Sequence, residues 1–201
     1  MDPSIVIAST GLALQTVTSV LQAFATFRKS SVEKFFELLI QESPDMKRVE
    51  ASDKLKSQFF TIIEKVSREF DQKKLESWKN AAIHLATDFS EFDFNDCFIR
   101  TLDSITVFDL TVLQTIYSTD YPKESIQADT VAYFEKRKVN PEFVWQSLKQ
   151  LASHNLMTEK FNRVGVFGDG KPYLEPLHYV KNSLGVDFLK FVSSAETGSL
   201  K

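Results

Sequence analysis

The sequence predicts a mainly α-helical protein with one β-hairpin near its C-terminus. Apolar residues recur every three or four positions through most of the chain, which is the spacing of a helix face. Eighteen phenylalanines stand against only six glycines and six prolines, a composition typical of packed helices and not of loops. Near the C-terminus, Gly168-Asp169-Gly170 separates two runs rich in β-branched and aromatic residues, the pattern of a tight hairpin turn.

Length and composition restrict the class of protein. A chain of 201 residues, 43% of them hydrophobic, can bury the core of one large domain or two small ones. A net charge of −3 argues against nucleic-acid binding through an overall basic excess. The single cysteine, Cys97, excludes an internal disulfide and a multi-cysteine metal site, and it fits a reducing, cytoplasmic location. We expect Cys97 to be a half-buried structural thiol.

The N-terminal half is predicted to be a bundle of amphipathic helices, because its apolar spacing places those residues on one face. Ser30 with Glu33 forms a capping pattern that opens one helix, and Pro44 lies just beyond its end. An alternation of aromatic and polar residues predicts an ordered loop whose phenylalanines fill the core. The expected elements are helices at 3–27, 30–39, 49–70 and 75–89, the loop at 89–94 and a short helix at 98–105.

The last third of the chain predicts three short helices, a β-hairpin and a closing helix. Thr106, followed three residues later by Asp109, resembles an N-cap. Asn140-Pro141 supplies asparagine at the N-cap and proline at the first position of the helix expected at 141–155. Asn182 or Ser183 should cap the closing helix. The expected elements are helices at about 106–117, 129–138 and 141–155, strands at 156–167 and 173–180, and a helix at 183–192.

This order of elements is the outline of a winged helix, in which a two-stranded hairpin follows a compact core of three helices. Pro172 and Pro176 should confine the return strand to an edge or to bulges, since proline cannot donate to a strand ladder. The predicted organisation is therefore an N-terminal helical bundle packed on a C-terminal winged-helix-like unit. The expected boundaries are 1–105 for the bundle, 106–192 for the winged-helix-like unit and 193–201 for a polar tail.

The sequence carries no catalytic, cofactor-binding or metal-binding motif. Phosphate-binding glycine loops, the nucleophile elbow and the zinc-protease motif are all missing. His84 with Asp88 is interpreted as a pair on a helix surface, and the acidic residues of 91–109 as a solvated face whose spacing does not fit a calcium loop. We therefore predict a protein that is not an enzyme and needs no cofactor.

The helix after Pro141 provides the best candidate for a binding surface. If Val144, Leu148 and Leu151 face the core, the polar residues between them face solvent. In a DNA-binding winged helix this helix enters the major groove, while basic residues of the hairpin contact phosphates. The sparse basic groups favour a protein partner over duplex DNA. The candidate macromolecule-binding residues are Gln146, Lys149, Gln150, Ser153, Lys160, Arg163 and Lys171.

Two groups of residues resemble known bacterial proteins. The phrases Tyr173-Leu174, His178-Tyr179-Val180 and Leu184-Gly185-Val186-Asp187-Phe188-Leu189 resemble the closing strand and helix of prokaryotic winged-helix proteins. The residues from Trp78 to Leu85, with Phe98, Leu102, Asp109 and Leu113-Gln114, are similar to the bacterial abortive-infection family of the alpha type. The resemblance covers about 72–192 and lacks that family's proline after the tryptophan helix. It implies a host-defence or phage-related protein without known catalytic residues.

The leading hypothesis from the sequence is a non-enzymatic interaction or regulatory protein, bacterial and related to defence, that binds another protein through its winged-helix-like unit. The first alternative is a winged-helix transcription regulator that binds duplex DNA. The second is an effector anchored in a membrane by the uncharged segment 3–27, which is close to the length of a membrane-spanning helix. The same segment is also a candidate for self-association.

Overall fold

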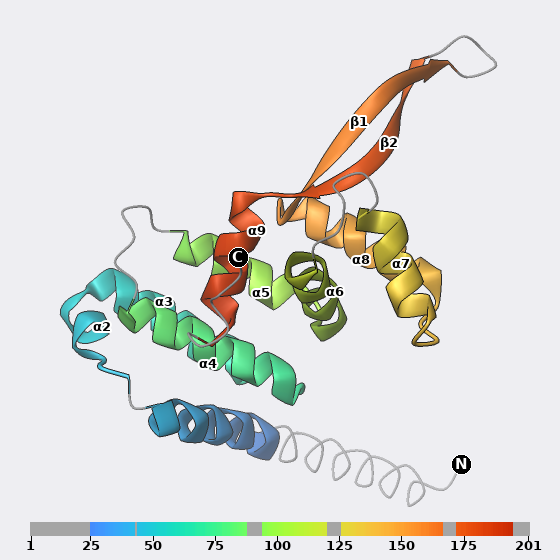
Figure 1. Cartoon of the computed structure of the whole chain (residues 1–201). Helices are drawn as coiled ribbons and strands as arrows, with labels where there is room; N and C mark the ends of the chain where they lie inside the picture. The colour runs from blue at the N-terminus through green and yellow to red at the C-terminus, as the bar shows by residue number, and fades with distance from the viewer. Residues whose placement is uncertain (1–24, 43, 88–93, 120–125, 167–171, 195–201) are drawn as a thin grey trace, which may run out of the picture. The chain divides into compact units, whose positions relative to one another are not determined.

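The structure, a computed structural model, describes residues 25–42, 44–87, 94–119, 126–166 and 172–194 (Figure 1). For residues 161–166 and 172–178 it describes the backbone alone. Within these ranges the chain is mainly helical, and its strands form a two-stranded antiparallel sheet. The predicted mainly α fold with a β-hairpin is thereby confirmed.

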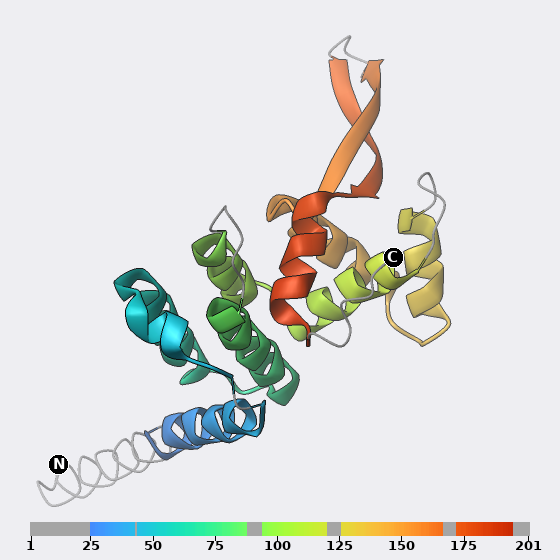
Figure 2. The same cartoon turned by 60° about the vertical axis from the view of Figure 1, so that its left-hand side comes forward.

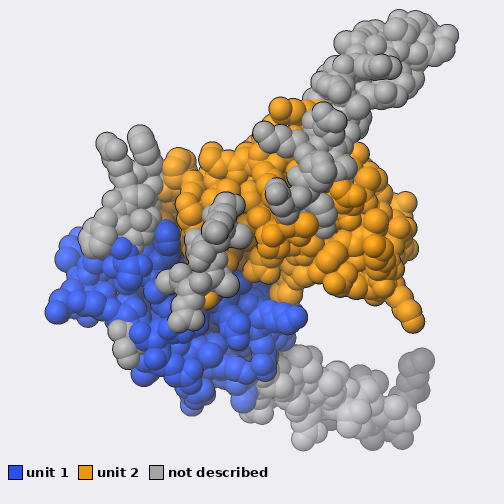
Figure 3. Space-filling view, in the orientation of Figure 1, with its two compact units in different colours: residues 1–87 blue, residues 88–201 orange. Residues whose placement is uncertain are grey.

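The chain divides into two compact units, residues 1–87 and 88–201 (Figure 3). The predicted domains divided later, between residues 105 and 106. The difference is the helix α5 (Asn95–Ser104), which belongs to the second unit. Its Phe98 ring packs on Phe188 and Phe191 of the closing helix, with ring centroids 5.6 and 5.4 Å apart. Aromatic contacts between distant segments decide this membership, and spacing within one helix does not reveal them.

Unit 1 begins, in its described part, with a helix at 25–42. The predicted helix start at Ser30 is wrong, because the helix is already formed at residue 25 and Ser30 lies exposed within it. The neighbouring Ser31 is buried instead, and its Oγ donates to the Glu69 carbonyl at 3.1 Å. A capping pattern describes only a few residues, so it cannot exclude a helix that runs through it.

The predicted helix at 49–70 is two helices, α2 (Lys47–Ala51) and α3 (Asp53–Val66). Ser52 separates them, with an extended backbone (φ −124°, ψ 117°). Its Oγ accepts a hydrogen bond from the Leu55 N–H at 3.3 Å and so caps the start of α3. α4 (Gln72–Thr87) then packs against α2 and α3. The core residues of unit 1 include Phe35, Leu39, Ile62, Val66, Leu75, Trp78 and Leu85.

Unit 2 contains α5, α6 (Val107–Ser118), α7 (Ile126–Glu135), α8 (Pro141–Ser153), the strands β1 (Met157–Val166) and β2 (Pro172–Lys181), and α9 (Ser183–Val192). α6, α7 and α8 contact one another, α8 contacts β1, and α7 contacts β2. Figures 1 and 2 both show the hairpin extending away from the helices of this unit.

Three predicted caps in unit 2 are confirmed. Thr106 Oγ1 accepts from the Asp109 N–H at 3.1 Å, while the Asp109 carboxylate accepts from the Thr106 N–H at 2.7 Å. Asn140 accepts from the Glu142 N–H at 3.0 Å ahead of Pro141, and Asn182 accepts from the Gly185 N–H at 2.8 Å. Each cap satisfies a backbone N–H that the first helical turn leaves without a partner.

The hairpin pairs Met157 with Lys181 at one end and Val166 with Pro172 at the other. Its register shifts on both sides of Phe161, the residue opposite Pro176. A proline cannot donate a ladder hydrogen bond, so an irregularity at this point agrees with the prediction that the prolines confine the return strand to an edge or to bulges.

Other predictions fall on residues that the structure does not describe. These are most of the helix at 3–27, most of the loop at 89–94, the turn Gly168-Asp169-Gly170 and most of the polar tail. In the part of the chain that is described, no helix has both the length and the apolar content needed to cross a membrane.

Candidate macromolecule-binding surface

The structure places α8 with the predicted side toward the core. Asn140 and Pro141 fix the start of the helix, and from there Val144, Leu148 and Leu151 follow at the spacing of one face. All three side chains are fully buried. The helix therefore lies with its opposite face toward solvent, as its apolar spacing predicted.

The four candidate residues of α8 are all exposed: Gln146, Lys149, Gln150 and Ser153. Two of them are held by neighbouring groups. Ser153 Oγ donates to the Gln150 carbonyl at 2.7 Å, and Gln150 Nε2 lies 3.1 Å from His154 Nε2. His154 Nε2 is also 3.2 Å from Ser104 Oγ at the end of α5. Among the described residues, Lys149 has no hydrogen-bond or ion-pair partner.

The structure describes the three candidate residues of the hairpin to different extents. Lys160 is exposed in β1, opposite His178 in the register. Arg163 lies in β1 opposite Glu175, and only its backbone is described. Lys171 lies outside the described residues. The register thus puts an acidic residue across from one of the predicted phosphate-contacting residues, a neighbour that the linear sequence does not indicate.

A hollow of about 380 Å³ lies where the last turn of α8 meets the base of the hairpin. Two of the predicted residues, Lys149 and Ser153, line it. The other lining residues were not predicted, and those of the hairpin come together only through the strand register that places Glu159 opposite Tyr179. The full lining is Lys149, Ala152, Ser153, Asn155, Met157, Thr158, Glu159 and Tyr179.

The electrostatics of this hollow are mixed. Burial raises the pKa of Tyr179, and the nearby Glu159 carboxylate raises it further by charge and by a hydrogen bond. The C-terminal end of α8 adds the partial negative charge of its last carbonyls. Lys149 is the only cation in the lining. The hollow therefore offers acceptors, one phenol and one ammonium group, a set suited to polar and cationic groups.

A basic turn precedes α8. Lys136, Arg137 and Lys138 are all exposed, and the Arg137 guanidinium lies 3.6 Å from the centre of the Tyr133 ring. Lys138 has a φ of 63°, the left-handed conformation that ends a helix. These three residues are not among the predicted candidate residues. They come just before Asn140 and Pro141, so the sequence itself places them beside the start of α8.

Three other expectations can be compared with the structure. Cys97 is exposed, so its prediction as a half-buried thiol is wrong; it lies on the outer side of α5, next to the buried Phe98. Asp109 is buried in its capping box, whereas Asp96 and Asp103 are exposed as the acidic-face interpretation expected. Among the described residues, no group of three or more histidine, cysteine or acidic side chains could hold a metal ion.

Comparisons of the chain with protein-family models, with curated proteins and with solved structures gave no match. The resemblance to the abortive-infection family therefore stays a prediction.

Proposed function

We propose that the chain is a non-enzymatic interaction protein that binds another protein through the outer face of α8 and the base of the hairpin. The observation that carries this proposal is the hollow lined by Lys149, Glu159 and Tyr179, which adjoins the exposed face of α8. A defence-related role in a bacterial cytoplasm is part of the proposal, and the family resemblance and the single cysteine support it.

The proposal treats the second unit as a winged-helix-like module. The mutual contacts of α6, α7 and α8 support it, as does a hairpin that contacts both α7 and α8. In such a module α8 corresponds to the recognition helix and the hairpin to the wing. The four exposed residues of α8 leave the recognition face open to a partner.

The charge distribution favours a protein partner. A phosphate group placed in the hollow would meet the Glu159 carboxylate and the negative end of α8. A lysine, arginine or amide side chain would instead find acceptors there, and the Lys149 ammonium could pair with an acidic neighbour of that residue. Interfaces with proteins commonly combine such polar groups with partly buried aromatic side chains such as Tyr179.

Site-specific photocrosslinking in living cells tests the proposed surface. A photoreactive residue in place of Lys149 should give a discrete protein adduct, and Ser153→Arg in the same chain should remove it by filling the hollow. The matched control is a photoreactive residue in place of Lys190, an exposed lysine of α9 in the same unit. The proposal fails if the two positions give the same adducts or if position 149 gives none.

Duplex DNA is the second candidate partner, and the basic turn of Lys136, Arg137 and Lys138 favours it. The turn lies just before the N-terminus of α8, whose partial positive charge also attracts phosphate. DNA binding predicts an affinity that falls steeply with salt and weakens when Lys149, Lys160 and Arg163 become alanine. A mobility-shift measurement at low salt that shows no complex would eliminate this candidate.

A further inference from the structure

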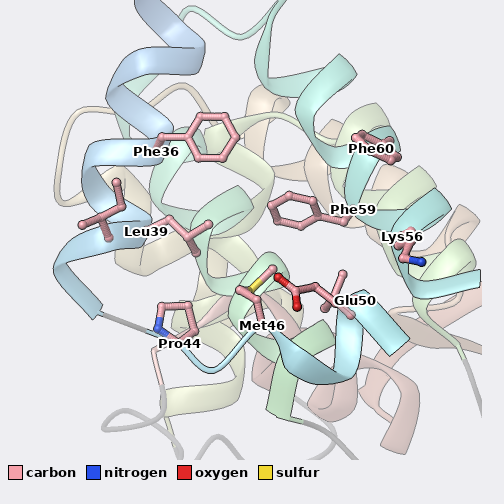
Figure 4. Close-up of a pocket in the computed structure, with 10 residues that line it drawn as sticks. Phe36, Leu39, Pro44, Met46, Glu50, Lys56, Phe59 and Phe60 are labelled. Carbon is pink, nitrogen blue, oxygen red and sulfur yellow. The ribbon is translucent and has the colours of Figure 1, made fainter. Parts of the chain in front are cut away.

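Unit 1 contains an apolar groove of about 580 Å³ (Figure 4). One wall is the C-terminal part of the helix at 25–42, the other is the first half of α3, and Met46 lies at the base between them. We call this hollow the unit 1 groove. Its lining residues are Phe36, Leu39, Ile40, Pro44, Met46, Val49, Glu50, Lys56, Phe59 and Phe60.

The unit 1 groove is open and strongly apolar. Figure 4 shows Phe36 and Phe59 projecting toward one another from opposite walls. At the rim, Ile40 is 70% exposed and Phe60 is 66% exposed. Single exposed apolar residues are common on a protein surface, whereas a continuous apolar patch is typical of an interaction site. The large apolar side chains around this open hollow form such a patch.

We propose that the unit 1 groove binds the uncharged N-terminal segment, residues 3–24, of a second copy of the chain. Two chains that exchange their segments reciprocally would form a closed homodimer with two identical contacts. This inference concerns unit 1 alone and is independent of the function proposed for unit 2.

The composition of the segment matches the groove. The chain has no charged residue between Asp2 and Arg28. An uncharged segment suits an apolar binding site, because no charge has to be buried. Its apolar stripe has the spacing of a helix that lies in a hydrophobic groove, with anchors three and four residues apart. The stripe consists of Leu14, Val17, Leu21 and Phe24.

The point where the segment joins unit 1 favours a second copy over the same chain. Phe27 stacks on Phe70, just beyond the end of α3, with ring centroids 4.0 Å apart. The groove lies against the other half of α3, and Phe36 is roughly 14 Å further along the helix than Phe27 at about 1.5 Å per residue. A segment of the same chain must therefore reverse its direction before residue 25 to reach the groove.

The sequence lacks the two strongest turn-forming residues near that point. No glycine or proline occurs between Gly11 and Pro44, although these are the residues that most often allow a chain to turn back. A segment from a second copy needs no reversal next to residue 25. The occupant that the observations favour is accordingly the partner's segment.

Analytical ultracentrifugation of the full chain over a concentration series tests the proposal. The wild-type chain should dimerise, and Val17→Asp or Phe60→Asp should each raise the dissociation constant by at least roughly 30-fold, because an aspartate would be buried without a partner. The matched controls are Ser19→Asp, on the opposite side of the stripe, and Phe143→Asp, an equally exposed phenylalanine of α8. Both controls should dimerise like the wild type.

Mixing two variants distinguishes exchange between copies from folding back within one chain. Val17→Asp retains an intact groove and Phe60→Asp retains an intact segment, so an equimolar mixture should form a heterodimer through one remaining contact. Circular dichroism of each variant checks that the helices are retained. A wild-type chain that is monomeric at every concentration, or variants that do not associate when mixed, would overturn the proposal.

Discussion

Gly185 lies in the first turn of α9, where that turn approaches Tyr117 and the chain leaving α8. A Cβ atom at this position would collide with the Leu156 carbonyl oxygen and with the Tyr117 hydroxyl group. One of these obstacles is backbone and the other is held by hydrogen bonds, so neither can move aside easily. The absence of a side chain at Gly185 thus permits this close approach of α9 to Tyr117 and Leu156.

Gly185→Ala should lower the free energy of unfolding by about 1–3 kcal/mol, as overpacking does, even though alanine is the better helix former. Chemical denaturation of the two proteins measures the difference. Lys190→Ala, at an exposed position of the same helix, should change the value by less than about 0.5 kcal/mol. A Gly185→Ala chain that is as stable as the wild type would show that the contact is not close.

Tyr117 joins three parts of unit 2 through its hydroxyl group. It donates to the Leu156 carbonyl at 2.8 Å and accepts from the Asn182 N–H at 2.9 Å. Burial raises the pKa of Tyr117 above 10.0, and the hydrogen bond with the Asn182 backbone opposes this only in part. The folded chain therefore holds the phenolic proton more tightly than the unfolded chain.

The raised pKa predicts a loss of stability at alkaline pH. Below pH 10.0 the contribution of Tyr117 is fully present, and it declines as the pH rises through the pKa of the folded state. Tyr117→Phe should reduce this decline and lower the stability at neutral pH by about 1–3 kcal/mol, because the Leu156 carbonyl loses its donor. Denaturation curves at neutral and alkaline pH measure both effects. An unchanged alkaline decline in the variant would contradict the assignment.

At the scale of elements, α8 buries the hydroxyl group of Ser147 without a hydrogen bond among the described residues. Ser147 is 2% exposed, and its Oγ has no hydrogen-bond partner among the described residues. A buried hydroxyl without a partner costs free energy, and alanine is also the better helix former.

Ser147→Ala should therefore raise the free energy of unfolding by about 1 kcal/mol. The comparison variant is Ser153→Ala, which removes an exposed hydroxyl from the same helix and should have a smaller effect. Thermal and chemical denaturation measure both. A destabilised Ser147→Ala chain would mean that the hydroxyl has a partner in solution, such as a bound water molecule.

Two serines show why some helix starts were predicted correctly and others were not. Ser30 with Glu33 matches a capping box and yet lies inside a helix, whereas Ser52 caps α3 and was not recognised. Thr106 with Asp109 was predicted and is confirmed. The local pattern is the same in kind at Ser30 and at Thr106. Tertiary contacts, such as the Phe27–Phe70 stack at the start of the first described helix, decide whether the backbone uses it.

At the scale of the whole molecule, the two proposed surfaces lie in different compact units. The unit 1 groove is lined by residues between 36 and 60, and the hollow beside α8 by residues between 149 and 179. Substitutions at distant sites without shared partners usually have additive effects. Self-association and partner binding should accordingly respond to different substitutions.

Phe60→Asp should weaken dimerisation strongly and leave the crosslinking at position 149 unchanged. Lys149→Glu should leave the sedimentation behaviour unchanged while weakening partner capture by crosslinks placed at Lys160. Sedimentation and photocrosslinking should both be measured on the Phe60→Asp chain and on the Lys149→Glu chain. Loss of partner capture in the Phe60→Asp chain would show instead that partner binding requires the dimer.

The sequence predicted much of the candidate surface because α8 is a regular amphipathic helix. Its four outward residues follow directly from three inward ones, so Gln146, Lys149, Gln150 and Ser153 are exposed as expected. The hollow beside them could not be predicted. Glu159 and Tyr179 are far apart in the chain and meet only through the hairpin register, which shifts near Pro176.

The sequence by itself determined the mainly helical class, the hairpin, the inward face of α8 and the caps at Thr106, Asn140 and Asn182. These features depend on residues within a turn or two of one another, and local hydrogen bonds and apolar periodicity are enough to specify them. Only the tertiary structure decided that α5 belongs with α9, that Ser52 divides a helix, and where the two hollows lie. Each of these depends on contacts between distant residues, whose energies no local pattern contains.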